Sequence, residues 1–432
     1  MKGARGKGSW PPFRGNHVRG FFRRRVPGQL VIQLTDRCNG SCPQCGMRVS
    51  RHFPRSTLKT DEVKRIIDAA VARGVQILSF TGGEPLLMLD ELVGLIRYAG
   101  QSGVEYIRTG TNGFMFQHPE RPEFTSRVAH LADALAATPL RNFWISVDSA
   151  DPARHEGMRG FAGVFKGIEK ALPMFHERGL YPTANLGINR NLADNGARSP
   201  DLGDPGGNGC SPHRFYRFYR QAFDNFYRVV TEMGFTLVSA CYPISLVQED
   251  GDRGLRAVYG ANSPDAVVRF SRLEKAILFQ GLLDTIPRHR SRIRIVSPRS
   301  ALYALGRAQM GEPHVSYPCL GGRDYFFVNA GDGSTYPCGY RGGENLGRLW
   351  SLDGLSGEGE ANCSRCEWEC FRDPSYLLHP FLEAASRPFK LAKDLYKDPA
   401  FFKLWAEDVR YYKACDLFDG RVPPDFSRLG RF

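Results

Sequence analysis

The sequence predicts an α/β protein in which a parallel sheet is followed by a small cysteine-rich domain and C-terminal helices. From residue 29 to about 240, short apolar runs alternate with stretches whose apolar residues recur at three- and four-residue spacing, the pattern of strands and amphipathic helices. Six such alternating units predict a parallel sheet that is covered by helices. Five of the eleven cysteines then cluster between residues 319 and 370.

The six predicted strands are apolar runs bounded by polar or turn-forming residues. The segments between them are predicted helices. In one of these, Val63, Ile66 and Ala70 fall on one helical face. The predicted strands are Leu30–Thr35, Val75–Thr81, Val104–Thr109, Phe143–Val147, Tyr181–Gly187 and Phe235–Ala240.

The chain of 432 residues divides into four predicted parts. Residues 1–28 form a basic arm with eight Lys and Arg residues and no acidic residue, in a chain of net charge +13. Such an arm can contact nucleic acid or an anionic substrate, or it can be a flexible leader, which its Gly and Pro content favours. The other parts are the barrel over 29–310 with a loop insertion at 189–212, the cysteine-rich domain over 311–375 and a helical extension over 376–432.

The loop insertion is too long and polar to be a simple connector. It is either a lid or substrate-contact segment above the strand ends, or a surface excursion. The segment after it mixes aromatic residues with arginines, a composition seen in nucleic-acid stacking. However, Phe215, Tyr219 and Phe226 recur at helical spacing, which favours an amphipathic helix facing the core.

Composition points to a cytoplasmic protein without a membrane partner. No apolar stretch approaches the ~20 residues of a membrane-spanning helix, and no signal-peptide core follows the basic start. Clustered cysteines in an intracellular chain indicate metal ligation rather than disulfides. Nucleic acid is not an expected partner of the folded body.

The first cysteine group is Cys38, Cys42 and Cys45, in DRCNGSCPQC directly after the first predicted strand. Three thiolates at C-x3-C-x2-C spacing can hold three irons of a four-iron cluster, whereas such clusters normally take four protein thiolates. The open iron indicates a site that binds a further ligand. Two alternatives remain: a structural zinc site with His52 as the fourth ligand, and reduced cysteines without metal.

A glycine-rich turn, Gly82-Gly83-Glu84-Pro85, follows the second predicted strand. Together with the cysteine triplet it resembles the radical S-adenosylmethionine (SAM) superfamily. The resemblance implies a partial (β/α)6 radical SAM barrel of the TIM type, in which the open iron chelates the amino and carboxylate groups of SAM. It also implies that the turn presents backbone groups to the SAM amine. Both motifs fall at the carboxyl ends of predicted strands, where the sites of parallel barrels lie.

The resemblance implies further SAM contacts after the third and fourth strands. Ser146 and Asp148, in ISVDSADPARHEGMRG, would lie near the ligand, and Arg159 would reach its carboxylate, which guanidinium groups bind bidentately. Asn112, in the turn GTNG, is another polar candidate. Without the resemblance, Arg159 is a surface charge at a helix start. The chain departs from the family at Gln44, where many members carry an aromatic residue near the adenine.

The second cysteine group lies in the C-terminal third of the chain. Its C-x13-G-x4-C spacing and later C-x2-C resemble the SPASM and twitch extensions of some radical SAM enzymes, which implies one auxiliary 4Fe–4S cluster. The C-x2-C-x3-C run is shorter than that of a full SPASM domain, so a second auxiliary cluster is not implied. Zinc held by four of the five thiols is the alternative. The five cysteines are Cys319, Cys338, Cys363, Cys366 and Cys370.

The activity implied is that of a radical SAM oxidoreductase or maturase. Such an enzyme cleaves SAM reductively to a 5′-deoxyadenosyl radical that takes hydrogen from a substrate carbon, with net oxidation or rearrangement assisted by the auxiliary cluster. Its partners would be a small-molecule or peptide substrate and a low-potential donor such as flavodoxin or ferredoxin. Two other classes stay open: a zinc-stabilised nucleic-acid-binding protein, and a non-catalytic iron–sulfur electron carrier.

Overall fold

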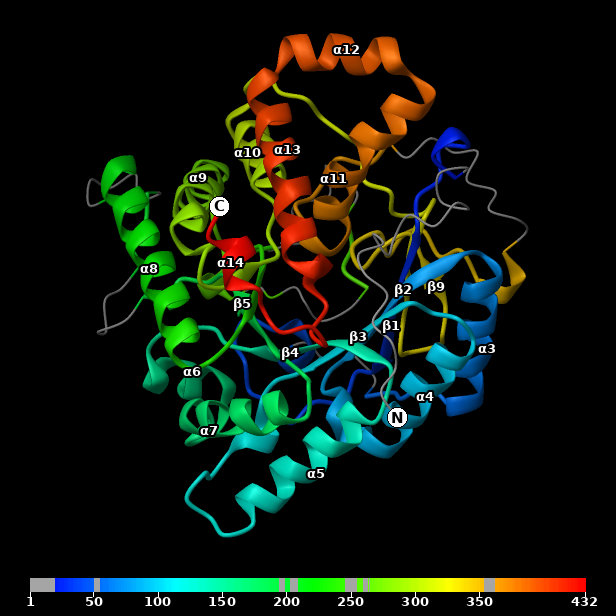
Figure 1. Cartoon of the computed structure of the whole chain (residues 1–432), viewed down its shortest axis with the longest axis vertical. Helices are drawn as coiled ribbons and strands as arrows, with labels where there is room; N and C mark the ends of the chain where they lie inside the picture. The colour runs from blue at the N-terminus through cyan, green and yellow to red at the C-terminus, as the bar shows by residue number, and fades with distance from the viewer. Residues whose placement is uncertain are drawn as a thin grey trace.

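The computed structural model describes residues 20–49, 55–193, 199–202, 209–244, 255–258, 263, 265–352 and 362–432. These residues form one nine-stranded sheet with the strand order β7-β6-β5-β4-β3-β2-β1-β8-β9 (Figure 1). Strands β1 to β8 are parallel to their neighbours, and β9 is antiparallel to β8. The strands are β1 (Gly28–Thr35), β2 (Val75–Gly82), β3 (Tyr106–Thr111), β4 (Leu140–Ser146), β5 (Thr183–Gly187), β6 (Leu237–Cys241), β7 (Arg294–Ile295), β8 (Tyr325–Val328) and β9 (Thr335–Tyr336).

Helices cover the outer face of this sheet. Leu30 and Ile32 of β1 and Phe80 of β2 point to that face and are fully buried in the main hydrophobic core. The predicted partial barrel of six parallel β/α units is therefore confirmed. The longer helices are α3 (Thr60–Ala72), α4 (Leu89–Gln101), α5 (Phe124–Ala136), α6 (Pro152–Arg159), α7 (Val164–Glu177), α8 (Pro212–Glu232), α9 (Arg272–His289), α10 (Arg299–Met310), α11 (Glu369–Ser386), α12 (Pro388–Lys397) and α13 (Pro399–Ala414); the short ones are α2 (Gly46–Val49) and α14 (Phe426–Leu429).

Helix α8 is the aromatic and arginine-rich segment after the loop insertion. Phe215, Tyr219 and Phe226 are fully buried in the main core, as the spacing predicts. Of the insertion itself, residues 194–198 and 203–208 lie outside the described residues, so its predicted role as a lid stays a prediction.

The cysteine-rich region is continuous with the barrel sheet. Strand β8 pairs with β1 in parallel, with Leu30 opposite Phe326. Alternate side chains of β8 enter two different cores: Phe326 packs in the main core, whereas Phe327 packs in a second core with Trp368 and Phe371. The cysteine-rich domain was predicted over residues 311–375. Its first boundary places β8 in a different domain from its partner strand β1, and its second boundary falls inside α11. The reason is that β8 is apolar on both faces, so it fits only between two cores.

The last residues of the chain lie at the amino ends of the barrel strands. Leu237, at the start of β6, is buried with Tyr411 and Phe418. The N–H of Tyr181, just before β5, donates to the carbonyl of Gly420 at 2.7 Å. The C-terminal segment therefore closes this end and leaves the carboxyl ends of the strands free for a site.

Part of the predicted basic arm is ordered. Phe21 and Val26 are buried, and Arg25 pairs with the buried Asp324 at 2.5 Å. This ion pair anchors residues 20–27, so the prediction of a flexible arm up to residue 28 is wrong for that stretch. Residues 1–19 lie outside the described part of the chain. Within the described part, no helix is long and apolar enough to cross a membrane.

Candidate functional site

The loop that carries Cys38, Cys42 and Cys45 leaves β1 and passes directly over the glycine-rich turn after β2. The N–H of Gly83 donates to the carbonyl of Thr35 at 2.7 Å. A Cβ on Gly82 would lie 2.5 Å from the Thr35 carbonyl oxygen, and one on Gly83 would lie 1.9 Å from the Arg37 carbonyl oxygen. Only glycine fits such a close backbone approach. The two glycines therefore set the path of the cysteine loop.

Glu84 stabilises the same turn from inside the protein. Its side chain is fully buried, and its carboxylate oxygens accept the N–H of Leu86 at 3.0 Å and the N–H of Asn112 at 2.6 Å. Both oxygens are thus used to join the turn after β2 to the turn after β3. Glu84 is placed to hold these two turns together rather than to contact a ligand directly.

Burial raises the pKa of Glu84 from 4.5 to about 7, although its hydrogen bonds with backbone N–H groups act in the opposite direction. Between these two pH values the folded state binds more protons than the unfolded state, so this group's contribution to stability is lost as pH rises through the window. Relative to a Glu84→Gln variant, the wild-type protein should lose up to about 3 kcal/mol of unfolding free energy between about pH 5 and about pH 8. Urea unfolding of both proteins at the two pH values measures this. The same pH dependence in both would contradict a buried, titrating Glu84.

Asn112 connects the third strand to the cysteine loop. Its Nδ2 group donates to the Asn39 side-chain oxygen at 2.9 Å and approaches the Cys38 sulfur at 3.6 Å. Its Oδ1 atom accepts the N–H of Phe114 at 3.0 Å. Asn112 is therefore beside the first cysteine of the triplet, and its predicted contact with SAM stays a prediction.

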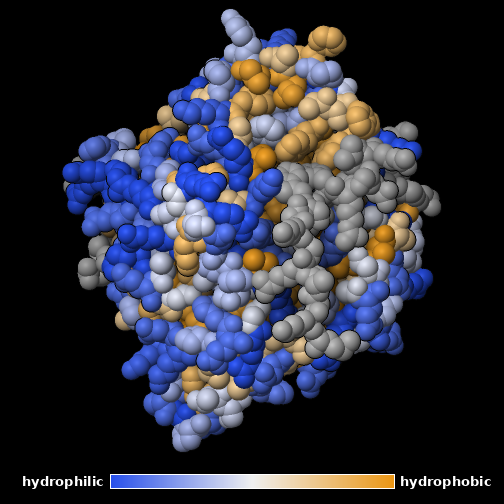
Figure 2. Space-filling view, viewed as in Figure 1, coloured by the Kyte–Doolittle hydropathy of each residue, from blue (hydrophilic) through white to orange (hydrophobic). Residues whose placement is uncertain are grey.

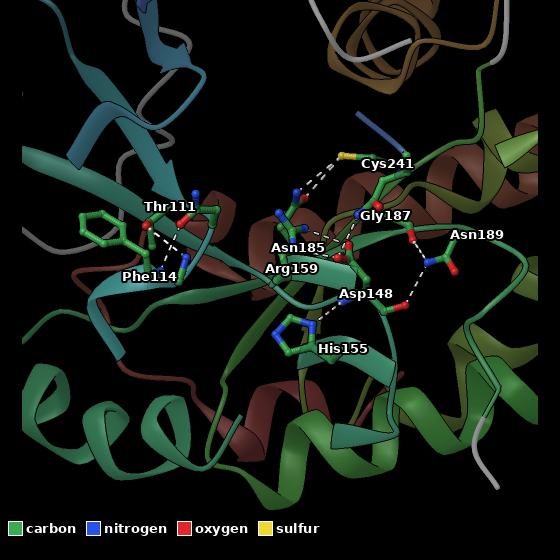
Figure 3. A network of polar contacts seen from close by, with 12 residues as sticks. Thr111, Phe114, Asp148, His155, Arg159, Asn185, Gly187, Asn189 and Cys241 are labelled. Atoms are coloured by element: carbon green, nitrogen blue, oxygen red, sulfur yellow. Dashed lines mark hydrogen bonds and ion pairs between the residues drawn. The ribbon is translucent and has the colours of Figure 1, made fainter. Parts of the chain in front are cut away.

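Asp148 and Arg159 form a buried ion pair after β4 (Figure 3). The Arg159 Nε and Nη2 atoms lie 2.6 Å and 2.8 Å from the two carboxylate oxygens of Asp148. Gln44, two residues past Cys42, donates to the same carboxylate at 2.9 Å. The pKa of Arg159 is raised because the negative charge of Asp148, and of Cys42 and Cys45 when ionised, outweighs the effect of burial. The pair and the cysteine loop thus form one site.

Two residues that the sequence analysis did not single out support Asp148. The Asp148 N–H donates to Nδ1 of His155 at 3.2 Å, so this histidine carries its proton on Nε2 when neutral. Burial lowers the pKa of His155 to about 4, which keeps it neutral. Asn189 donates to the Asp148 carbonyl at 2.9 Å and to the Gly187 carbonyl at 2.7 Å. The available signal for Asn189 was a polar residue two positions after the end of β5. Ser146 ends β4 beside Asn185 of β5 and is buried.

The cysteine loop has several features that fit an iron–sulfur cluster. The N–H of Gly40 donates to the Cys38 sulfur at 3.3 Å, and a Cβ on Gly40 would lie within 3.6 Å of the sulfurs of both Cys38 and Cys42. Burial raises the pKa of Cys42 and raises that of Cys45 to about 12, so buried thiolates here require a compensating cation. Among the described residues no three His, Cys, Asp or Glu side chains converge on a single metal ion. A cluster makes no such demand, because each thiolate binds a different iron.

Four of the five C-terminal cysteines surround one cavity, and the fifth does not. The cavity is also lined by Arg341 and Arg372, two cations that suit an anionic cluster. The N–H groups of Gly321 and Tyr340 each donate to a cysteine sulfur at 3.4 Å, as the N–H of Gly40 does in the first site. Such hydrogen bonds tune bound iron–sulfur clusters. The four lining cysteines are Cys319, Cys338, Cys363 and Cys366.

Cys370 lies apart from this cavity, on the first turn of α11. Its sulfur contacts the carboxylate of Glu369 at 3.7 Å. The other Glu369 oxygen accepts the N–H of Tyr242 at 3.3 Å, just past the carboxyl end of β6. Cys241, the last residue of β6, interacts with the same carboxylate and contacts Asn185 at 3.5 Å (Figure 3). Cys370 and Cys241 therefore share the Glu369 carboxylate at the carboxyl end of β6.

Taken from the residues alone, the chain is an α/β-barrel protein with a three-thiol loop, a glycine-constrained turn and a buried Arg–Asp pair at the carboxyl edge of its sheet. Residues 32–189 match the family model described as the radical SAM superfamily. This match covers little more than a third of the chain, and members of the radical SAM superfamily use SAM and a 4Fe–4S cluster. The match agrees with the predicted barrel fold and with the expectation that this chain uses SAM and a 4Fe–4S cluster.

Curated relatives are similar over about a third of the chain. The GTP 3′,8-cyclase of Pelotomaculum thermopropionicum is 34% identical over 170 residues, which is 37% of this chain and 46% of that protein. The AdoMet-dependent heme synthase of Methanosarcina barkeri is 30% identical over 141 residues, 33% of this chain and 37% of that protein. The chain thus spans less than half the length of these relatives. The similarity indicates an enzyme, without defining its reaction.

Two solved structures are similar at lower identity. Native anSMEcpe with bound AdoMet is 15% identical, covers 88% of this chain and 100% of its own, and has a TM-score of 0.49. Streptococcus suis SuiB bound to S-adenosylmethionine is 15% identical, covers 72% of this chain and 60% of its own, and has a TM-score of 0.45. Scores below 0.5 carry no information on substrate.

Proposed function

We propose that this chain is a radical SAM enzyme that acts in the cytoplasm and abstracts a hydrogen atom from a substrate carbon. The observation that carries the proposal is the joining of three motifs at one edge of the sheet. The cysteine loop lies on Gly82 and Gly83, contacts Asn112, and shares Gln44 with the Asp148–Arg159 pair.

The thiols of Cys38, Cys42 and Cys45 would hold the SAM-binding cluster. When bound, the cluster and SAM supply a 5′-deoxyadenosyl radical. The protein's own residues orient and enclose these groups. Gly82 and Gly83 present backbone at the turn after β2, and Ser146 ends β4, two strands away in the sheet. Arg159, held by Asp148, directs positive charge toward the cysteines and is placed to receive the SAM carboxylate.

Measurement of iron, sulfide and zinc after anaerobic reconstitution tests this proposal, with a Cys38→Ala/Cys42→Ala/Cys45→Ala variant alongside. We expect about eight irons per chain in the parent protein and about four in the variant. Only the parent should cleave SAM to methionine and 5′-deoxyadenosine under reducing conditions. Zinc with negligible iron in both proteins, or SAM cleavage by the variant, would refute the proposal.

We further propose that an auxiliary 4Fe–4S cluster occupies the second cavity on Cys319, Cys338, Cys363 and Cys366. Support comes from the shared cavity, the backbone N–H donors to sulfur and the two lining arginines. Four protein thiolates leave no open iron. The cluster would therefore serve electron transfer rather than substrate ligation, which agrees with net oxidation.

Single substitutions distinguish the four ligands from the fifth thiol. Cys338→Ala and Cys366→Ala should each lower the iron content by about four per chain, because a three-thiol site no longer encloses the cluster. Cys370→Ala should retain the full iron content, since its sulfur contacts Glu369 instead of the cavity. Iron and sulfide assays on the three variants decide the assignment. If Cys370→Ala loses as much iron as Cys338→Ala, Cys370 is a cluster ligand and the assignment from the cavity lining is wrong.

The substrate would lie inside the barrel, between Arg159 and the first turn of α11. The side chains on this inner face are polar: Arg108 donates to Ser79, and Ser239 donates to Asn185 at 2.8 Å. Cys241 lies two residues beyond Ser239 on β6. Arg108 contributes a positive charge there. We propose a small polar or anionic substrate on this basis, with flavodoxin or ferredoxin as the class of electron donor.

A further inference from the structure

Helix α12 protrudes from the molecule. It lies across the ends of α11 and α13, at one extremity of the long axis (Figure 1). It contains no buried residue. Phe389 and Tyr396 are 92% and 88% exposed, and Leu395 is 52% exposed. Figure 2 shows apolar residues gathered at this end of the molecule. Large apolar side chains this exposed mark an interaction surface.

The exposed residues of α12 form two stripes. Phe389, Ala392 and Tyr396 are spaced three and four residues apart and share one apolar stripe. Lys393 and Lys397 form a cationic stripe beside it, and both are exposed. Neither lysine has an acidic partner within 4 Å in the described part of the chain. A short helix with an exposed apolar face bordered by lysines has the pattern of helices that lie in a membrane interface.

The neighbouring residues extend the aromatic surface but not the positive charge. Lys390 differs from the other lysines because it pairs with Asp394 at 2.5 Å and with Glu383 at 3.7 Å. The pair with Glu383 joins the inner side of α12 to α11, whereas the pair with Asp394 lies within α12. Phe21 packs on Phe381 of α11 at a ring distance of 6.2 Å, which places the 67% exposed Phe22 near the same end.

We propose that α12 docks this protein on an anionic lipid surface, with Phe389 and Tyr396 inserted and Lys393 and Lys397 facing the headgroups. Charge complementarity selects this occupant. A second copy of the chain would bring lysine against lysine. Residues 1–19 contain no acidic residue, so they would be repelled as well. The helix projects outward as a convex ridge, which suits a flat surface better than a protein groove. The expectation of no membrane partner rested on the absence of a membrane-spanning stretch. Binding of α12 to a membrane surface needs no such stretch.

Co-sedimentation of the reconstituted protein with vesicles tests this proposal. We expect binding to phosphatidylglycerol–phosphatidylcholine vesicles, little binding to pure phosphatidylcholine, and weakening as salt concentration rises. Phe389→Ser/Tyr396→Ser should lower the partition coefficient about tenfold or more. Lys393→Glu/Lys397→Glu should abolish the preference for the anionic lipid. Iron content and thermal unfolding of both variants should match the parent, because the changed residues are exposed.

Phe426→Ser is the matched control. Phe426 is 55% exposed and lies on α14, away from α12. This variant should bind vesicles like the parent. Equal binding of the α12 variants and the parent, or equal binding to both vesicle types, would overturn the proposal. So would a parent dimer in light scattering without lipid that the α12 variants convert to monomer, since that result assigns the surface to a second copy.

Discussion

Replacement of Gly83 by alanine should abolish the SAM-binding cluster while the rest of the fold persists. The new Cβ would lie 1.9 Å from the Arg37 carbonyl oxygen and 3.0 Å from the Cβ of Cys38. The obstacle is backbone, so the loop that carries Cys38 must move rather than a flexible side chain. We expect iron content to fall by about four per chain, with loss of SAM binding in equilibrium dialysis.

Gly94→Ala provides the matched control for this prediction. Gly94 lies in the middle of α4, and beyond its chain neighbours and its own helix backbone no atom lies within 4 Å of the position its Cβ would take. The change should preserve the iron content and stabilise the protein by roughly 0.5–1 kcal/mol, because alanine favours a helix interior. If Gly83→Ala retains iron and SAM binding as Gly94→Ala does, the close approach of turn and loop does not determine the site.

Arg159→Ala should have the second largest effect, on stability as well as on SAM binding. The Asp148 side chain is only 1% exposed, and its two oxygens lie within 2.8 Å of the Arg159 guanidinium. Removing the arginine leaves a buried carboxylate without its counter-charge, which typically costs about 3–5 kcal/mol. Urea unfolding measures the loss. SAM affinity, measured by dialysis on reconstituted protein, should fall below detection.

Two further variants separate charge loss from the loss of a SAM contact. Arg178→Ala removes an ion pair with Asp133, whose side chain is 65% exposed, and should cost less than about 1 kcal/mol. Arg159→Ala/Asp148→Ala removes both buried charges and should recover much of the lost stability, yet it should not recover SAM binding. If Arg159→Ala costs no more than Arg178→Ala, the buried pair is not the structural element described here.

The local elements of the barrel were predictable because each carries its own periodicity. Strand β1 and helix α8 follow from apolar spacing that would bury the same side chains in any compact packing. The triplet Cys38, Cys42 and Cys45 was identifiable for a similar reason, since its spacing is short and local. By contrast, β8 was assigned to a separate domain, because a four-residue strand does not encode its partner.

Long-range neighbours were decided only by the tertiary structure. The support of Asp148 by His155 and Asn189 joins residues from separate segments, and no spacing rule connects them. The same holds for Cys370: five thiols were visible in the sequence, but the start of α11 at Glu369 turns this one toward Cys241 and away from the cavity.

The sequence by itself therefore determined the elements, the radical SAM motifs and the sets of candidate ligands of this protein. The tertiary structure decided which members of those sets meet. The physical reason is that periodicity and loop spacing act over a few residues, whereas the burial of β8 between two cores and of Asp148 beside Arg159 depends on the packing of the whole sheet.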